Sequence, residues 1–440
     1  MKIACVTLGC RTNQHDTAEM QTLLEQEGFA IVGHQEKADA YVINTCTVTQ
    51  KSDSSSRLAV KKSLALNPNA LVVFTGCYAQ LNPQEAADLN GLDIVLGNAN
   101  KLEIAEVIKK KLLNPGRQWQ KTDATEIVMS DIHRKRIFRA IPVKNFQGMT
   151  KAFIKVQTGC DEKCAFCTVV RARGKSVSDS RENILNNINE AIDSGFKEIT
   201  LTGINLGTWG MDIGETFSSL VHEIVELPGD FRVRLSSINP MEIDNGLIRL
   251  IAETEKLCSY LHIPLQSGDN EILKRMRRNY NREQYLDVVN RTSNAIPNLG
   301  LGADVIVGFP GETKAAFENT RKLIEELPFS YLHVFSYSPR RGTEANDFKD
   351  DVPGTIKKER NKILTQLIKE KGQKFKNKSL NQTATVLIEN QRDRKSGKLK
   401  GHSDNYIPIC LDGPDQLKNR LVPVTLQQVL GDHVEGCVLS

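Results

Sequence analysis

The stretch that decides the fold of the central region is "AFIKVQTGCDEKCAFC", residues 152 to 167. An apolar run typical of a β-strand leads directly into a loop that carries Cys160, Cys164 and Cys167. Five further strand-like runs, each followed by a helical stretch, extend this pattern: "EITLTGIN", "RVRLSSI", "SYLHIPLQ", "GADVIVGF" and "YLHVFSYS". Six such units over residues 148–375 predict a partial (β/α)6 barrel with the cysteine loop at its carboxyl mouth, where barrel enzymes build their sites.

Residues 1–115 predict a separate α/β domain, an open parallel sheet with the strands "KIACVTL", "DAYVIN", "ALVVFT" and "DIVLG". Three of these strands end just before Cys10, Cys46 and Cys77. Ligands bind at the carboxyl ends of parallel strands, so the three thiols are expected to face a common point. A single strand-end cysteine is more often a small core residue, but the repetition at three equivalent positions favours a shared ligand.

The remaining segments differ from this α/β pattern. Residues 116–147 show weak periodicity and are interpreted as a linker, while the β-branched runs of residues 376–440 predict a small β-barrel. The basic turn "RDRKSGKLKG", with His402 and Tyr406 available for base stacking, suggests a nucleic-acid surface. The alternative is a solvated helix followed by a charged turn.

Composition limits the class of protein. The 440 residues are 40% hydrophobic and 25% charged, with a net charge of +5, which is ordinary for a globular chain and too mild by itself to indicate nucleic-acid binding. We expect a cytoplasmic protein with no membrane partner, because neither a signal peptide nor a long apolar run is present. That compartment keeps thiols reduced, so the ten cysteines are not expected to form disulfides, and four of them are interpreted as ordinary core or surface residues: Cys5, Cys258, Cys410 and Cys437.

The three-cysteine loop lacks a nearby fourth ligand. A structural zinc site would normally close with another Cys or His, so zinc remains the less favoured alternative. A four-iron cluster held by three cysteines instead keeps one iron open for a substrate or cofactor.

The same loop resembles a known signature. "CDEKCAFC", with Phe166 before the last cysteine, is similar to the CxxxCxxC motif of radical S-adenosylmethionine enzymes. The resemblance implies that Cys160, Cys164 and Cys167 hold a [4Fe–4S] cluster whose open iron binds S-adenosylmethionine. Reductive cleavage of that cofactor gives a 5′-deoxyadenosyl radical, which can break a C–H bond that acid–base catalysis cannot activate.

Further motifs narrow the resemblance to the methylthiotransferases over essentially the whole chain. They occur in the family's order: "TLGCRTNQHD", "VINTCTVT", "FTGCYAQ", "LTGINLG", "LSSINP", "HIPLQSGDNEILKRMRRNY", "DVIVGFPGET" and "VFSYSPRRGTEA". The resemblance implies a second [4Fe–4S] cluster on Cys10, Cys46 and Cys77, and a terminal RNA-binding TRAM module. His15 and Thr168 depart from the family's usual Tyr and Pro, and His15 is expected to make a local hydrogen bond rather than to be a ligand.

The methylthiotransferases modify an adenosine beside the tRNA anticodon or an aspartate of a ribosomal protein. "INTCTVTQKSDSSSR" and "RLSSINPMEI" look most like the enzymes that methylthiolate carbon 2 of N6-threonylcarbamoyladenosine at position 37 of tRNA. The alternatives are isopentenyladenosine, the ribosomal aspartate and, as a different class, a noncatalytic iron–sulfur RNA-binding protein. An enzyme of this kind also requires an external electron donor and a sulfur source.

Strand-end positions facing the cluster are the predicted cofactor contacts, together with Phe166: Thr202, Gly203, Ser236, Ser237, Gln266, Gly308 and Glu312. Glycine turns and serine caps are also common at βα junctions, so each of these has a structural alternative. Basic residues after the cysteine loop and after the sixth strand are candidates to meet RNA phosphate or a cofactor carboxylate: Arg171, Arg173, Lys175, Arg340 and Arg341.

Overall fold

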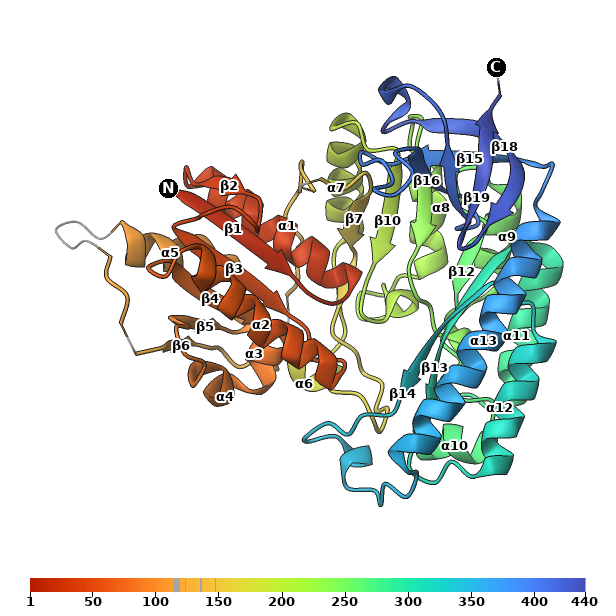
Figure 1. Ribbon diagram of the computed structural model, residues 1–440, viewed down its shortest axis with the longest axis horizontal. Coiled ribbons are helices and arrows are strands. Elements are labelled where there is room, and N and C mark those ends of the chain that lie inside the picture. Colours follow the sequence, from red (N-terminus) through yellow and green to blue (C-terminus); the bar gives the residue numbers. More distant parts are fainter. Residues whose placement is uncertain (114–118, 123, 135–136, 147, 440) are drawn as a thin grey trace. The chain divides into compact units, whose positions relative to one another are not determined.

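The computed structural model describes residues 1–113, 119–122, 124–134, 137–146 and 148–439. The chain divides into two compact units (Figure 1). The N-terminal unit comprises residues 1–147, 153–162 and 168–190, and the C-terminal unit comprises residues 148–152, 163–167 and 191–440. This division passes through the three-cysteine loop. The four-part domain organisation inferred from the sequence stays a prediction.

The N-terminal unit contains a six-stranded parallel sheet in the order β2-β1-β3-β4-β5-β6. Its strands are β1 (Lys2–Thr7), β2 (Ala30–Val32), β3 (Ala40–Thr45), β4 (Leu71–Gly76), β5 (Ile94–Leu96) and β6 (Glu126–Val128). The four predicted strands are confirmed. Short β2 and β6 were not predicted, and β6 lies inside the segment interpreted as a linker, of which positions 116–118, 123, 135–136 and 147 lie outside the described residues.

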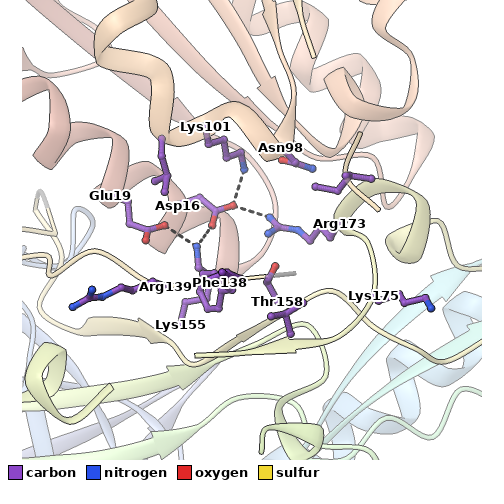
Figure 2. A pocket seen from close by; sticks show the side chains of 14 residues that line it. Asp16, Glu19, Asn98, Lys101, Phe138, Arg139, Lys155, Thr158, Arg173 and Lys175 are labelled. Carbon is purple, nitrogen blue, oxygen red and sulfur yellow. Dashed lines mark hydrogen bonds and ion pairs between the residues drawn. The ribbon is translucent and has the colours of Figure 1, made fainter. Parts of the chain in front are cut away.

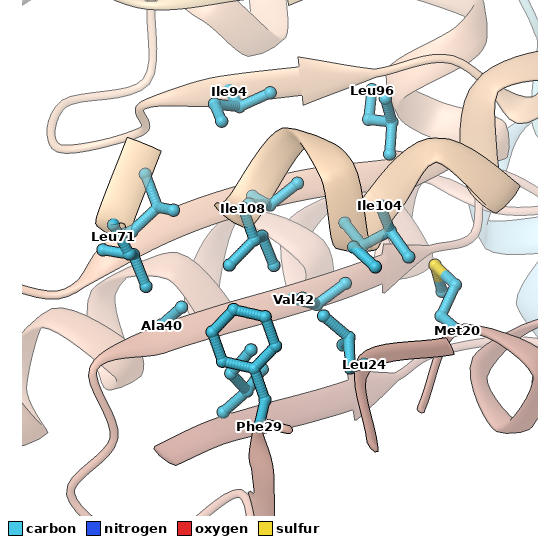
Figure 3. Packing of buried hydrophobic residues seen from close by; sticks show 14 residues of the cluster. Met20, Leu24, Phe29, Ala40, Val42, Leu71, Ile94, Leu96, Ile104 and Ile108 are labelled. Carbon is cyan, nitrogen blue, oxygen red and sulfur yellow. The ribbon is translucent and has the colours of Figure 1, made fainter. Parts of the chain in front are cut away.

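Helices cover both faces of this sheet, because β3 and β4 are buried on both sides and cannot face water. On one face, Met20 and Leu24 of α1 and Ile104 and Ile108 of α5 pack on Val42 and its neighbours (Figure 3). On the other face, α2, α3 and α4 pack on Ile43 and its neighbours. The helices are α1 (Arg11–Gln26), α2 (Gln50–Leu66), α3 (Cys77–Leu81), α4 (Pro83–Ala87), the 3-10 helix η1 (Asn98–Glu103) and α5 (Ile104–Leu112).

Three further pieces of chain complete this unit. Strands β8 (Gln157–Thr158) and β9 (Val177–Ser178) form an antiparallel pair, and α6 (Val169–Arg173) lies between them in sequence. Helix α6 packs against α3 of the sheet domain. Helix α7 (Arg181–Asp193) follows β9, and its last three residues belong to the C-terminal unit.

The six strands predicted for the central region are all present, followed by helices as expected. They are β7 (Ala152–Lys155), β10 (Glu198–Thr202), β11 (Arg232–Leu235), β12 (Tyr260–His262), β13 (Gly300–Val307) and β14 (Tyr331–Ser336). In the C-terminal unit β10 pairs parallel with β11, and β12, β13 and β14 form a parallel sheet. Parallel bridges from Val233 to Leu257 and from Ser237 to His262 link the β11 and β12 segments, so their carboxyl ends share one rim.

Helices separate these strands in the chain, as a series of βα units requires. They are α8 (Phe217–Glu226), α9 (Asn245–Glu253), α10 (Asn270–Arg275), α11 (Arg282–Ala295), α12 (Lys314–Glu326) and the 25-residue α13 (Gly354–Lys378). Their N-termini are well capped: the side chains of Asp244 and Thr313, for example, accept hydrogen bonds from the first turns of α9 and α12.

After α13 the chain forms a closed five-stranded barrel, which confirms the predicted small β-barrel. Its strands are β15 (Thr383–Ile388), β16 (Leu399–Ser403), β17 (Pro408–Leu411), β18 (Leu421–Leu430) and β19 (His433–Val438). Alternate residues of these strands fill its interior. Among the residues that the structure describes, no helix has both the length and the apolar composition needed to cross a membrane.

Candidate active site

Three cysteines follow the carboxyl ends of three adjacent parallel strands. Cys10 comes three residues after β1 and is the N-cap of α1, Cys46 directly follows β3, and Cys77 directly follows β4. Because β1, β3 and β4 are neighbours in the sheet, the predicted strand-end arrangement is confirmed. Cys10 is exposed, Cys77 is half-buried and Cys46 is buried, so the group extends from the surface into the sheet rim.

The backbone around these cysteines is too close-packed for any side chain at two glycines. A Cβ atom on Gly9 would lie 2.6 Å from Cβ and 2.8 Å from Sγ of Cys46. A Cβ atom on Gly76 would lie 2.4 Å from the backbone of Thr45. Both glycines also have a φ of +98°, a region that other residues rarely adopt. The glycines therefore bring the three cysteine loops together.

Asn13, on the first turn of α1, ties two of these loops. Its side-chain nitrogen donates hydrogen bonds to the carbonyl oxygens of Leu8 (2.8 Å) and Thr45 (2.9 Å), beside Cys10 and Cys46. Its side-chain oxygen accepts a hydrogen bond from the Arg173 guanidinium at 2.5 Å. Asn13 is 1% exposed, so this arrangement is sealed from solvent.

The three thiols influence one another electrostatically. Burial raises the pKa of Cys46 to about 11, and the neighbouring Cys77 and Cys10 add to that rise. The amide nitrogen of Asn98 lies 4.0 Å from Sγ of Cys77 and donates a hydrogen bond to the carbonyl of Ala172 (2.7 Å). A bound cation or metal cluster would relieve the repulsion among three thiolates.

A network of buried ion pairs lies beside the cysteines in the same unit (Figure 2). One carboxylate oxygen of Asp16 accepts from Lys155 (2.6 Å), and the other accepts from Lys101 (2.6 Å) and Arg173 (2.9 Å). Lys155 also donates to Glu19 at 2.7 Å. Burial alone would raise the pKa of Asp16, but the three cations outweigh it and hold that pKa well below its usual range.

Two sequence predictions are decided by this network. His15 donates through Nδ1 to the carbonyl of Phe153 (2.5 Å) and places Nε2 3.5 Å from Glu19, so its predicted role as a local hydrogen-bonding residue is confirmed. Arg173 is 7% exposed and its guanidinium binds Asp16 and Asn13. The prediction that Arg173 meets RNA phosphate is therefore wrong, whereas Arg171 and Lys175 are exposed and remain candidates.

The second group of cysteines is divided between the two units. In the N-terminal unit, the backbone N–H of Cys160 donates to the carbonyl of Gly174 (3.2 Å). In the C-terminal unit, the N–H of Cys167 donates to the carbonyl of Cys164 (3.1 Å), which turns the loop back on itself. All three are half-buried. Phe166 packs edge-on against Phe309, with ring centroids 6.4 Å apart, and so anchors the loop in an aromatic cluster.

Sequence reasoning missed Arg278, which contacts this loop directly. Its guanidinium donates to Sγ of Cys164 (3.1 Å) and to the side-chain oxygen of Asn239 (2.7 Å), and it lies over the ring of Tyr280. Burial opposes the charged form, but Tyr280 and Cys164 raise the pKa of Arg278 above its ordinary value. The signal was present in the quoted "KRMRRNY" motif, but four basic residues in a row of seven do not say which one is buried.

The predicted cofactor contacts lie at the ends of parallel strands. Thr202 ends β10, Ser236 follows β11, and Gly308 follows β13. Gln266, after β12, has a φ of 61° and forms a parallel bridge with Val305 of β13. Gly203 and Ser237 directly follow Thr202 and Ser236, and Glu312 lies four residues after Gly308. Their assignment as cofactor contacts stays a prediction.

Glu312 has a clear structural role at the turn after β13. One carboxylate oxygen accepts from the backbone N–H of Gly308 and from Arg360, both at 2.6 Å. Burial raises the pKa of Glu312 despite these bonds, and its other oxygen has no hydrogen-bond partner among the described residues. The carboxylate therefore fixes the glycine turn and leaves one acceptor for a further donor.

A second buried ion network joins the core of the C-terminal unit to its β-barrel. Glu198 on β10 pairs with Arg232 and Arg234 on β11, and Lys151 lies 3.6 Å away. The arginines donate four further hydrogen bonds, of 2.8–3.0 Å, to backbone carbonyls of the barrel strands and the β16–β17 turn: those of Thr385, His402, Ser403 and Asp404. Glu198 is fully buried, and the two arginines paired with it attach the barrel to the core by charge-assisted hydrogen bonds.

The contacts of the barrel revise the expected nucleic-acid surface. His402 and Tyr406 stack on each other at 4.9 Å, and Tyr406 also packs on Tyr260 and under Arg234. These rings are engaged with protein groups at the attachment to the core, which disfavours the predicted base stacking. In the basic turn, Arg392 and Lys398 form ion pairs, whereas Arg394 and Lys395 are exposed and have no ion pair among the described residues.

No ligand geometry for a single metal ion is formed in the described part of the chain, where no three His, Cys, Asp or Glu side chains are close enough to hold one. The donor chemistry nevertheless fits an iron–sulfur group, which takes Cys thiolates. Cys10, Cys46 and Cys77 supply three thiols at one sheet rim, with cations beside them.

Known protein families match both the N-terminal region and the central region of the chain. Residues 2–97 match the uncharacterized protein family UPF0004, and residues 154–324 match the Radical SAM superfamily. A threonylcarbamoyladenosine tRNA methylthiotransferase MtaB from Aquifex aeolicus is 41% identical, with 94% of this chain and 97% of that protein covered. The protein of the same name from Bacillus subtilis is 34% identical over 99% of this chain and 95% of its own.

A relative with a different named substrate and a solved structure are also similar to this chain. A tRNA-2-methylthio-N(6)-dimethylallyladenosine synthase from Clostridium tetani is 31% identical over 98% of this chain and 94% of its own. The radical S-adenosylmethionine methyltransferase TsrM from Kitasatospora setae superposes with a TM-score of 0.56 at 14% identity, covering 78% of this chain and 75% of that one. At that identity the structural likeness concerns the fold alone.

Proposed function

The chain belongs to the radical S-adenosylmethionine methylthiotransferases of tRNA, and from this premise we propose that it attaches a methylthio group to carbon 2 of N6-threonylcarbamoyladenosine at position 37, beside the anticodon. The observation that carries the choice of substrate is the 41% identity to the Aquifex aeolicus threonylcarbamoyladenosine enzyme over nearly the full length of both chains. The relatives named for dimethylallyladenosine match at 31–34% identity.

As a radical S-adenosylmethionine enzyme, the chain uses an iron–sulfur cluster and S-adenosylmethionine. When bound, this pair supplies the 5′-deoxyadenosyl radical that breaks an aromatic C–H bond. We assign the cluster to Cys160, Cys164 and Cys167. Arg278 supports the assignment, because its guanidinium donates a hydrogen bond to Sγ of Cys164 and so orients this side chain. Phe166 holds the loop against Phe309.

A second [4Fe–4S] cluster is proposed on Cys10, Cys46 and Cys77. The support is their position on three adjacent strand ends, the close packing of their loops that Gly9 and Gly76 allow, and the nearby Arg173. Three ligands leave one iron open to hold the sulfur that is transferred. The strand-end residues of the C-terminal unit are proposed to bind S-adenosylmethionine: Thr202, Gly203, Ser236, Ser237, Gln266, Gly308 and Glu312.

The remaining assignments describe the organisation and the partners. We propose a methylthiotransferase domain at residues 1–115, a linker at 116–147, a radical core at 148–375 and a TRAM-like RNA-binding barrel at 376–440. Transfer RNA is the partner, and we assign its contacts on the barrel to exposed Arg394 and Lys395. The reaction also needs an external electron donor and a sulfur source, and we place the enzyme in the cytoplasm.

The test is mass spectrometry of nucleosides from digested tRNA, comparing cells that lack the chain with the same cells expressing it. A methylthio mass increment on threonylcarbamoyladenosine is expected. An increment on isopentenyladenosine instead would overturn only the choice of base. If no nucleoside changes, a ribosomal-protein aspartate becomes the substrate to examine.

An assay of the purified protein separates catalysis from a noncatalytic iron–sulfur role. The chain is reconstituted with iron and sulfide without oxygen, reduced with dithionite and incubated with S-adenosylmethionine. Formation of 5′-deoxyadenosine is expected. A protein with a full iron content that forms none would be an RNA-binding iron–sulfur protein rather than a radical enzyme.

A further inference from the structure

The buried ion network of the N-terminal unit is not balanced in charge. It contains two carboxylates, Asp16 and Glu19, and three cations, Lys101, Lys155 and Arg173, each at most 7% exposed. Every carboxylate oxygen accepts at least one hydrogen bond or ion pair. These five buried side chains therefore carry one more positive charge than negative charge.

The excess charge lies next to the cysteines. Arg173 uses one guanidinium nitrogen for both of its bonds, to Asp16 and Asn13, and its Nε has no hydrogen-bond partner among the described residues. After Asp16, the groups that most favour the charged form of Arg173 are Cys77 and Cys10. Helix α6, which Arg173 ends, packs on α3, which begins at Cys77.

A buried cation without a compensating anion is strongly unfavourable. Three thiolates on an iron–sulfur core carry net negative charge, and net charge is one of the factors that set the reduction potential of such a cluster. The cation left over in this network and the anion expected at Cys10, Cys46 and Cys77 thus complement each other. Burial lowers the pKa of Lys101, while Asp16 and Cys77 favour its charged form and Arg173 opposes it.

The network also borders a cavity of suitable size for a small anion. The cavity has a volume of about 70 Å³ and is lined by Asp16, Lys101, Lys155 and Arg173 among others (Figure 2). One water molecule needs about 10–15 Å³ of this volume, so the cavity has room for a few waters or for a species the size of hydrosulfide. Cations outnumber anions in its lining, since Arg139 and Lys175 also face it.

We propose that Arg173 is a positioning residue of the N-terminal cysteine site: its fixed positive charge raises the reduction potential of the group bound by Cys10, Cys46 and Cys77 and increases the affinity of that site for a sulfur anion such as hydrosulfide. The inference rests on the second cluster of the proposed function. It adds that Arg173, although it follows the loop of Cys160, Cys164 and Cys167 in the sequence, acts on the site of Cys10, Cys46 and Cys77.

The experiment uses the full chain with Cys160, Cys164 and Cys167 replaced by alanine, so that only the N-terminal group is loaded. The cluster is titrated with a redox mediator and followed by electron paramagnetic resonance. In Arg173→Gln the reduced-to-oxidised ratio at a fixed potential is expected to fall about tenfold, equivalent to about 59 mV for a one-electron couple. Arg173→Lys keeps the charge and should stay near the parent value.

Two further variants separate charge from structure. Arg171→Gln removes the same charge from an exposed arginine of the same helix and should leave the potential unchanged. Asp16→Asn removes an anion and should move the potential in the opposite direction, upward. Titration of the reconstituted proteins with sodium hydrosulfide is expected to give a dissociation constant about tenfold higher in Arg173→Gln than in Arg173→Lys.

The outcomes distinguish this inference from the proposed function. If the background protein takes up no cluster, the second-cluster assignment is wrong and the inference falls with it. If the cluster forms and Arg173→Gln changes only the melting temperature, with potential and hydrosulfide affinity unchanged, Arg173 is structural and only the inference is wrong.

Discussion

The molecule contains two buried ion networks that have similar composition and different surroundings. Around Glu198, three cations share one carboxylate. The two arginines among them also donate hydrogen bonds to four backbone carbonyls of the β-barrel. Around Asp16, the cations are held by carboxylates and Asn13, and Nε of Arg173 has no hydrogen-bond partner among the described residues. Both networks contain more cations than carboxylates, but the arginines around Glu198 find carbonyl acceptors, whereas Nε of Arg173 is left without an acceptor at a cost in free energy.

The largest expected effect comes from replacing the three cysteines that are proposed to hold a cluster beside the Asp16 network. Cys10→Ala, Cys46→Ala and Cys77→Ala should each abolish methylthiolation while 5′-deoxyadenosine is still formed, because the radical cluster is separate. Iron content should fall from about eight to about four atoms per chain. The measurement is iron analysis together with chromatography of both products. Cys437→Ala, at an exposed site, is the control. Methylthio product from all three variants would contradict the second cluster.

Removing the carboxylate of Glu198 should lower the free energy of unfolding. Glu198→Ala leaves two buried arginines without their carboxylate, and breaking a buried pair in this way costs about 3–5 kcal/mol. Urea denaturation of the metal-free chain measures the loss. Glu226→Ala, at an exposed position of α8, should change the free energy of unfolding by less than about 0.5 kcal/mol. Equal stability of the two variants would show that the carbonyl bonds alone retain the arginines.

The acid dependence of stability should also separate the networks from ordinary surface charges. Burial raises the pKa of Glu19, but Lys155 and His15 lower it to a net value of about 2, against about 4.3 in an unfolded chain. A lowered folded-state pKa stabilises the protein above the unfolded pKa, by about 3 kcal/mol here, and this contribution is lost as the pH falls from about 4.5 to 2. The free energy of unfolding of wild type should therefore fall more steeply over that range than that of Glu19→Gln. Parallel curves would exclude a strong interaction with Lys155.

The sequence predicted what local patterns encode and missed what only tertiary structure brings together. Apolar runs and parallel topology were enough to place Cys10, Cys46 and Cys77 at neighbouring strand ends. The three-residue strands β2 and β6 were missed because their runs are too short to show alternation. The Asp16 network was missed because its members come from α1, η1, β7 and α6. Charged residues on a helix are normally exposed, and nothing local to "HDTAE" shows that Asp16 and Glu19 are buried.

The smallest expected effect concerns the charges that neither network uses. Arg394 and Lys395 are exposed on the basic turn, whereas Lys418 nearby is paired with Asp415 at 2.9 Å. Replacing Arg394 or Lys395 by Gln should weaken tRNA binding a few-fold and reduce the slope of log affinity against log salt by about 1, since each removes one phosphate contact. Lys418→Gln removes the same charge and should change neither quantity. Filter binding or fluorescence anisotropy at several salt concentrations measures both. If all three variants bind alike, the barrel contacts RNA through another face, and the Glu198 network then serves to orient that face relative to the core of its own unit.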